Sequence, residues 1–429
     1  MDAATKSEAS GLHSALRDKF IALVGNEYVR AATAIDAVAG VHSKLVIEPR
    51  TEQELAEILR LSNEAGLAVI PRGGGTKLGW GNPPARADLI LSTSRLVKII
   101  EHAWADLTVS VEAGCTIQKL QETLAQHGQR LALDPLWPEK ATIGGVLSTN
   151  DSGALRLRFG ALRDLIIGAT IALPDGTLAS SGGKVVKNVA GYDLPKLVTG
   201  AFGTLGIITR AVFRLHPLPR NTRSFSIAAA DAEATQRFVL AVQDSKLAHT
   251  CLQSHFSKDA PLVTDILFEG TPAGLAAQEA QLRNLSAPAI VAEASAPWTA
   301  REELWAFSDP EETAIAKISI LPANLARTIE MVGRTSRNHP LRWRVLIYAT
   351  GLGWLRLEGQ VGSLRNALKT LRGELQGQAG SLVALHNSDK MPEFDAWGSA
   401  GDALPLMKAV KQQLDPGNTL NPGRFVGGI

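Results

Sequence analysis

The sequence has 429 residues, of which 45% are hydrophobic and 20% are charged, with a formal net charge of +2. This balance is ordinary for a globular protein of two or three lobes, and it disfavours nucleic-acid binding because the basic residues form no arm or stripe. No run of about 18 apolar residues is present, so we expect no membrane span. The two cysteines, Cys115 and Cys251, form no CxxC pair, which disfavours structural zinc or a disulfide scaffold and fits a cytoplasmic protein.

The first part of the chain is predicted to contain short strands and a few helices. Thr51 and Glu54 have the spacing of a capping box, which predicts a helix from there to about Ala65. Apolar β-like runs at 43–49 and 67–71 flank it, so the glycine-rich stretch after Pro71 leaves the end of a strand. Further strands, and a helix that ends at Gly128, are expected before residue 216.

The pattern changes after the two prolines of "HPLPRNTRS" at 216–224, which mark a domain boundary. Beyond it, two successive runs have the order β-α-β-β-α-β. That order predicts an antiparallel sheet covered by helices on one face, in the manner of ferredoxin-like repeats.

The stretch "VIPRGGGTKLGWG" at 69–81 contains five glycines. A P-loop would need Gly-Lys-Ser/Thr, and a dinucleotide-binding βαβ loop would need a helix to start here, but two prolines follow instead. Consecutive glycine amides can point inward and bind a pyrophosphate without a helix dipole, and Arg72 and Lys77 could balance its charge. A wide surface turn is the alternative.

Two further clusters of small residues favour a ligand. The segment "ATIGGVLSTNDSG" at 141–153 and the segment "GAFGTLGIIT" at 200–209 both let backbone approach a flat, extended molecule, and their hydroxyls can donate to it.

Together with "RFGALRDLIIGATIALPDG", "GGKVVKNVAGYDLPKLVTGAFGTLGIIT" and the tail "LDPGNTLNPGRF", these motifs resemble the FAD-binding oxidoreductases of the vanillyl-alcohol-oxidase (PCMH) type. Within that family the chain is most similar to the FAD-binding (E) subunits of glycolate oxidase. The resemblance is strong over about 40–220 and 405–429, and elsewhere it rests on the pattern of elements.

The resemblance implies an α+β fold: a PCMH-type FAD-binding domain of two α+β subdomains, followed by an antiparallel-sheet cap with helices on one face. The expected divisions are an N-terminal helical lead-in at 1–38, the FAD-binding domain at 39–219, the cap at 220–404, and a C-terminal segment at 405–429 that returns to the FAD domain. The cofactor residues it implies are Arg72, Gly73, Gly74, Gly75, Thr76, Lys77, Thr142, Gly144, Gly145, Thr149, Gly153, Gly206, Ile207, Ile208 and Arg424.

Two departures from the family affect the chemistry. The glycine loop has Thr76 and no histidine, and the second cluster has no cysteine, so we expect FAD to be bound without a covalent link. The Glu-His-Gly motif of related 2-hydroxy-acid dehydrogenases is missing, and no histidines have metal-ligand spacing, so no metal is expected.

The catalytic base is therefore unknown. Weak candidates are His386, at a predicted strand end, and Arg344 and Arg356, on two adjacent cap strands where a guanidinium could hold a carboxylate. Each has a plain structural alternative, as do His255 and Lys187. Asp193 is expected to cap the helix "LPKLVTG".

The sequence thus favours an FAD-binding subunit of a glycolate oxidase or dehydrogenase complex, which oxidises a 2-hydroxy acid to a 2-oxo acid. Its partners would be a paralogous catalytic flavin subunit and an iron–sulfur subunit, since this chain has no cysteine cluster. Those partners could hold it at the inner face of the cell membrane. The alternatives are a stand-alone FAD-dependent oxidase or dehydrogenase of another hydroxy acid, sugar or alcohol, and a non-catalytic structural flavoprotein subunit.

Overall fold

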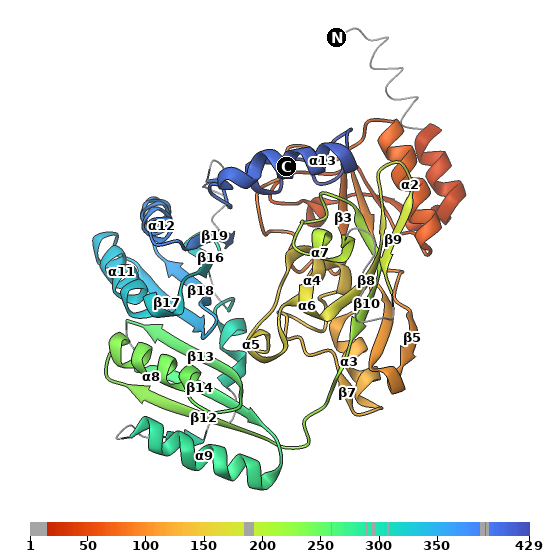
Figure 1. The fold of residues 1–429 in the computed structure, drawn as a ribbon. Helices are drawn as coiled ribbons and strands as arrows, with labels where there is room; N and C mark the ends of the chain where they lie inside the picture. Colours follow the sequence, from red (N-terminus) through yellow and green to blue (C-terminus); the bar gives the residue numbers. More distant parts are fainter. Residues whose placement is uncertain are drawn as a thin grey trace.

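The computed structural model describes residues 15–183, 193–258, 260–287, 291–293, 297–306, 309–386, 391 and 394–429. Within them, three main sheets form two bodies (Figure 1). The first body contains the first two sheets, and the second body, the cap, contains the third. The short helix α5 (Arg156–Phe159) lies between the bodies. Residues 15–24 are helical and pack on the first body. Among the described residues no helix is both long and apolar enough to span a membrane.

The first sheet has the order β1-β2-β4-β3 and is built around a parallel β-α-β unit. Its strands are β1 (Val29–Ala31), β2 (Leu45–Ile47), β3 (Val69–Arg72) and β4 (Leu89–Ser92), and α2 (Glu52–Glu64) links β2 to β3. The Thr51 hydroxyl accepts from the Glu54 amide at 3.1 Å, as predicted. The Glu54 carboxylate accepts from the Arg50 amide at 2.7 Å instead of the amide of the cap residue itself.

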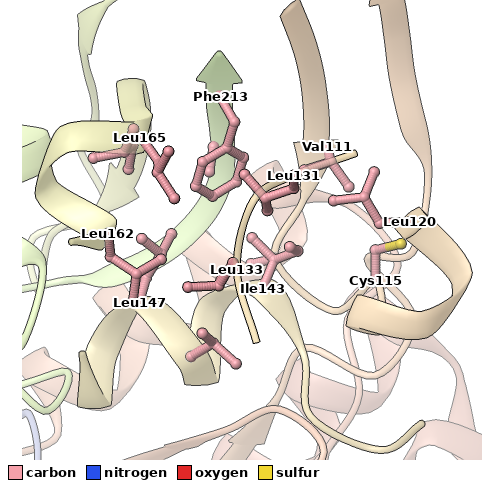
Figure 2. Close-up of a cluster of buried hydrophobic side chains, with 14 of the residues drawn as sticks. Val111, Cys115, Leu120, Leu131, Leu133, Ile143, Leu147, Leu162, Leu165 and Phe213 are labelled. Atoms are coloured by element: carbon pink, nitrogen blue, oxygen red, sulfur yellow. The ribbon is translucent and has the colours of Figure 1, made fainter. Parts of the chain in front are cut away.

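The second sheet is antiparallel, with the order β5-β6-β10-β8-β9. Its strands are β5 (Ile99–Ala103), β6 (Thr108–Glu112), β8 (Ile166–Ala172), β9 (Leu178–Gly182) and β10 (Ile207–Arg214); its helices are α3 (Ile117–Ala125), α4 (Ile143–Thr149), α6 (Leu162–Leu165) and α7 (Leu194–Val198). Figure 2 shows side chains of their shared core, among them Phe213 of β10, Ile143 and Leu147 of α4, and Cys115, a small buried residue. A short pair, β7 (Gln129–Arg130) and β11 (His216–Pro217), closes this body.

The cap is one sheet with the order β15-β12-β14-β13-β17-β18-β16-β19, and every neighbouring pair is antiparallel. The two predicted β-α-β-β-α-β runs are joined edge to edge by the β13–β17 pair. The strands are β12 (Thr222–Ala229), β13 (His249–Ser257), β14 (Leu262–Glu269), β15 (Val291–Glu293), β16 (Thr313–Ser319), β17 (Arg342–Tyr348), β18 (Leu352–Glu358) and β19 (Ser381–His386).

Four helices cover one face of the cap sheet: α8 (Ala232–Asp244), α9 (Pro272–Ser286), α11 (Leu325–Asn338) and α12 (Val361–Gln376) (Figure 1). The other face meets the first body, together with the segment 297–306, which holds α10 (Ala300–Glu303). Single 3₁₀ turns are η1 (Asn26–Tyr28), η2 (Ala34–Asp36), η3 (Trp104–Asp106), η4 (Pro297–Thr299), η5 (Pro322–Asn324), η6 (Gly401–Ala403) and η7 (Val426–Gly428).

After the cap, α13 (Leu404–Leu414) lies across the first body, and the tail returns to it (Figure 1). The tail adds a parallel bridge between Leu420 and Val69 of β3. The α+β fold class, with two subdomains followed by an antiparallel cap covered on one face, is confirmed.

Candidate cofactor site

A groove lies at the end of β3, between the glycine loop, α4, the turn before β10 and the C-terminal tail. The residues lining it are Pro71, Arg72, Gly73, Gly74, Gly75, Thr76, Lys77, Leu78, Thr93, Thr142, Gly144, Gly145, Ser148, Thr149, Phe202, Gly203, Gly206, Ile207, Ile208, Asn421 and Arg424. The groove therefore brings together every residue that the sequence analysis assigned to the cofactor except Gly153.

Two of the loop glycines are required by packing against the chain itself. A Cβ on Gly74 would lie 1.8 Å from the carbonyl oxygen of Lys140, and one on Gly73 would lie 2.1 Å from the Thr142 hydroxyl. Gly75 has a φ of +74°, in the left-handed region that favours glycine. The loop is thus pressed against the segment that leads into α4, and this close contact joins the first two glycine clusters into one wall.

The wall leaves polar groups available to a ligand. Among the described residues the amides of Gly73, Gly75 and Thr76 have no hydrogen-bond partner, whereas the Gly74 amide donates to the Thr142 hydroxyl at 3.4 Å. The buried Oδ1 of Asn421 also has no partner. The Oδ1 of Asn421 is buried, and buried polar atoms are rarely left without a protein, water or ligand partner, so it can accept from a hydroxyl or N–H group of a ligand. Gly73 and Thr76 are half-buried, Gly75 is exposed, and all three line the groove, so their amides can donate to a phosphate.

Gly145 supports the same conclusion from the side of α4. A Cβ there would meet only the Thr142 hydroxyl, at 3.4 Å, so no protein atom excludes a side chain. The lack of a side chain at Gly145 therefore keeps the groove open.

Neither predicted cation is free to balance phosphate charge. Arg72 forms an ion pair with Asp36 at 2.7 Å, and Asp36 is also bound by Arg30 at 2.8 Å. These hydrogen bonds, from Arg30 first and then Arg72, hold the pKa of Asp36 far below its usual range. The groove thus depends on backbone donors more than the sequence suggested.

Lys77 points away from solvent into a buried ionic network. Its Nζ lies 3.2 Å from Asp151, whose other oxygen is 3.1 Å from Arg301 of the cap segment 297–306. Arg301 also donates to the carbonyls of Ser152 at 2.7 Å and Asp134 at 2.6 Å. Burial would raise the pKa of Asp151, but Arg301 and Lys77 outweigh it and lower that pKa.

Burial lowers the pKa of Lys77 by more than the nearby carboxylate of Asp151 raises it.

Gly153, which was expected at the cofactor, belongs to this buried network instead. Its amide donates to Asp134 at 3.0 Å, and a Cβ would lie 2.4 Å from the Asp134 carboxylate.

Tryptophans surround the network. Trp80 of the glycine loop stacks on Trp305 of the cap at 5.7 Å between ring centroids, and Trp137 meets Trp305 edge-on at 5.2 Å. The Nζ of Lys77 lies over the rings of Trp80 and Trp137 at 5.6 and 5.3 Å. The sequence analysis missed this cluster because its members are far apart in the chain.

Arg424 acts as a clamp on the glycine loop. Its guanidinium is buried and donates to the carbonyls of Leu78 at 2.5 Å, Trp80 at 2.8 Å and Asn82 at 3.4 Å. Burial lowers its pKa to about 10. The turn before β10 is held to the tail by Asn421, which donates to the Phe202 carbonyl at 2.5 Å.

The catalytic candidates lie on the cap. Arg356 is buried and donates to the carbonyls of Glu303, Leu304 and Ala306, besides its ion pair with Glu358, so its guanidinium holds the segment 297–306. His386 ends β19, and its Nε2 lies 3.1 Å from the carbonyl of Pro310.

Arg344 is exposed and lines a separate cavity on the cap. Asp193 caps α7 by accepting from the Lys196 amide at 3.2 Å, as expected. Lys187 lies outside the described residues. Within the part of the chain that the structure describes, no cluster of three His, Cys, Asp or Glu could hold a metal.

Comparison with known proteins identifies the class of protein to which the chain belongs. Residues 43–182 match the family model described as "FAD binding domain", so the chain is an FAD-binding flavoprotein. Its fold is that of p-cresol methylhydroxylase, with a TM-score of 0.77, 14% identity and 96% of both chains covered.

Several named relatives extend over most of the chain. The glycolate oxidase subunit GlcD of Bacillus subtilis is 24% identical over 89% of this chain and 88% of its own length. The mitochondrial D-2-hydroxyglutarate dehydrogenase of Bos taurus is 29% identical over 90% of this chain and 77% of its own length. The expected resemblance is confirmed: the chain is an FAD-dependent oxidoreductase with the fold of p-cresol methylhydroxylase.

Proposed function

We propose that this chain is an FAD-binding subunit of a complex that oxidises a small 2-hydroxy acid, such as glycolate, to the 2-oxo acid and passes the electrons to an iron–sulfur partner. The observation that carries the cofactor part is the groove wall with three unpartnered amides and the unpartnered Oδ1 of Asn421. The substrate class is supported by the names of the relatives, and membership of a complex by the word subunit in one of them. The kind of partner follows only from the family resemblance.

In this proposal the chain's own residues bind and orient the cofactor. The amides of Gly73, Gly75 and Thr76 would donate to the pyrophosphate, and Thr149 and Ser148 of α4 would lie along the remainder of the molecule. Bound FAD supplies a two-electron acceptor. None of the described residues that line the groove is a histidine, cysteine or tyrosine, which supports binding without a covalent link.

The interactions of the cap arginines favour a subunit that relays electrons without oxidising the substrate itself. A hydroxy-acid site needs a group that holds the carboxylate and a base for the hydroxyl proton. Arg356 instead donates to three carbonyls of the segment 297–306 and pairs with Glu358. Arg344 lines a cavity separate from the cofactor groove, so neither arginine is among the residues that line the groove. The catalytic step is therefore assigned to a paralogous flavin subunit.

The test is an absorbance spectrum of the isolated, flavin-loaded chain before and after anaerobic glycolate. We expect the flavin bands to remain until the partner subunits are added, and then to bleach. Bleaching of the isolated chain at ~1–1000 per second would contradict the relay role and favour a stand-alone dehydrogenase. Acid denaturation should release all the flavin into the supernatant, and flavin that stays on the protein would contradict non-covalent binding.

A further inference from the structure

A cavity separate from the cofactor groove lies on the cap sheet, where β13 ends and β17 begins. We call it the cap cavity; its lining includes His255, Ser257, Glu303, Arg342, Arg344 and Glu358. None of these residues lines the groove. Ala300 and Leu304 also face it, whereas Arg301 of the same segment binds the first body, so this segment separates the cavity from that body.

A buried carboxylate sets the orientation of His255. Asp265 of β14, 2% exposed, accepts from Ser226 at 2.5 Å and Gln253 at 3.2 Å, and it also contacts Nε2 of His255. Nε2 faces the carboxylate, and the side-chain nitrogen of Gln253 lies 3.2 Å from the same ring nitrogen. In the tautomer that donates from Nε2 to the carboxylate, the acceptor of the ring is Nδ1. The structure gives that Nδ1 no partner among the described residues.

Arg344 lies on the same face of the neighbouring strand. It pairs in register with Ser257, two residues beyond His255, so the two side chains are diagonal neighbours, with Cα atoms roughly 7–8 Å apart. Arg342 is 3.5 Å from Glu358, which Arg356 also binds. Arg344 has no ion pair or hydrogen bond with any described residue, so its guanidinium is available.

A guanidinium binds a carboxylate with two parallel hydrogen bonds, and an imidazole nitrogen with a free lone pair accepts from a hydroxyl. A 2-hydroxy acid carries both complementary groups on adjacent carbons. We propose that the cap cavity binds a small 2-hydroxy monocarboxylate, with its carboxylate on Arg344 and its hydroxyl donating to Nδ1 of His255. This is a second ligand site, beyond the proposed function, and it carries out no reaction of its own.

The acidic residues of the cavity decide the charge of the ligand. Glu303 and Glu358 both line it. A second carboxylate on the ligand would be repelled by them, so a monoanion is favoured over a dicarboxylate.

The experiment is calorimetric titration of the full chain with glycolate, in the flavin-free and the flavin-loaded form. We expect glycolate to bind both forms, and Arg344→Met to weaken it about tenfold or more. Arg334→Met is the matched control, because it removes an exposed guanidinium that pairs with Glu374 between the helices on the other face of the cap. Arg344 is exposed, so its replacement leaves the core intact.

A second measurement tests the contribution of the His255 imidazole to binding. Acetate lacks the hydroxyl, so it should bind more weakly than glycolate to the native chain, and His255→Phe should reduce glycolate to the level of acetate. Should Arg344→Met fold poorly, Arg344→Lys keeps the charge but loses the two-point contact, and it should weaken glycolate to a smaller degree.

The proposal is overturned if glycolate gives no binding heat, if Arg344→Met binds as tightly as the native chain, or if loading with FAD abolishes binding, which would place glycolate in the groove. None of these results affects the bleaching test of the proposed function, so the two can fail independently.

Discussion

The cofactor groove and the contact between the two bodies use opposite kinds of chemistry. The groove offers backbone amides and glycines, and the charged side chains beside it are already engaged, Arg72 with Asp36 and Lys77 with Asp151. The interbody contact instead consists of side chains: buried charges enclosed by tryptophans. If the groove binds FAD as proposed, affinity for the cofactor depends on the shape of the backbone, whereas the contact between the two bodies depends on buried ion pairs.

The comparison predicts which substitutions matter where. In the groove a single added methyl group should be enough to abolish cofactor binding, because we propose that the backbone is the binding surface there. In the interbody contact the loss of one charge should be felt as lost stability, because its partners remain buried.

The largest expected effect is that of Gly74→Ala. Its Cβ would fall 1.8 Å from the Lys140 carbonyl oxygen, so the loop must move away from α4, and we expect the purified chain to lose its flavin. The ratio of flavin to protein absorbance measures this. Gly79→Ala is the matched control, since a Cβ there meets nothing within 4 Å. Normal flavin content in Gly74→Ala would show that the loop wall is not the binding surface.

Asp151→Ala should have the next largest effect. It leaves Lys77 and Arg301 charged and buried without their shared partner, which costs about 3–5 kcal/mol of unfolding free energy. Urea denaturation followed by tryptophan fluorescence measures it. Glu374→Ala breaks the exposed pair with Arg334 instead, and should cost at most about 1 kcal/mol. Equal losses in the two variants would remove the distinction between the buried network and a surface ion pair.

Lys317→Met should have the smallest effect and a pH signature. Burial lowers the pKa of Lys317 to about 8, below the ordinary 10.5 of the unfolded chain. Between these values the unfolded state binds more protons, so this lysine makes the native chain more stable as pH rises from about 8 to 10.5.

The methionine variant should lack that rise, and the difference in unfolding free energy from the native chain should change by about 2–3 kcal/mol across this range. Denaturation curves at pH 7.5 and pH 10 test it. Parallel pH dependence in both proteins would place Lys317 in water.

Local patterns were enough to predict the glycine loop, the Thr51 cap and the order of elements in the cap. They were not enough for α4, which the sequence analysis treated as a segment of small residues. Ile143, Val146 and Leu147 have helical spacing and are buried, and this tertiary burial outweighs the poor helix propensity of two glycines.

The partners of the charged residues could not be predicted. Asp151 and Arg301 are 150 positions apart, and Arg424 and Leu78 are 346 apart, so no local pattern links them. The two cap repeats were recognised, but their union in one sheet depends on the β13–β17 pair, which forms only in the complete fold.

The clamp at Arg424 has a consequence for biosynthesis. The carbonyls of the glycine loop are synthesised early, but the guanidinium that donates hydrogen bonds to them belongs to a residue more than three hundred positions later in the chain. Arg424 and Asn421 follow both sheets of the first body and the cap in the chain, so the groove that we assign to the flavin can be completed only after these two residues have been synthesised. Bound flavin then reports that synthesis has continued past Arg424. A chain truncated before Arg424 should contain no flavin even where the rest of it has folded.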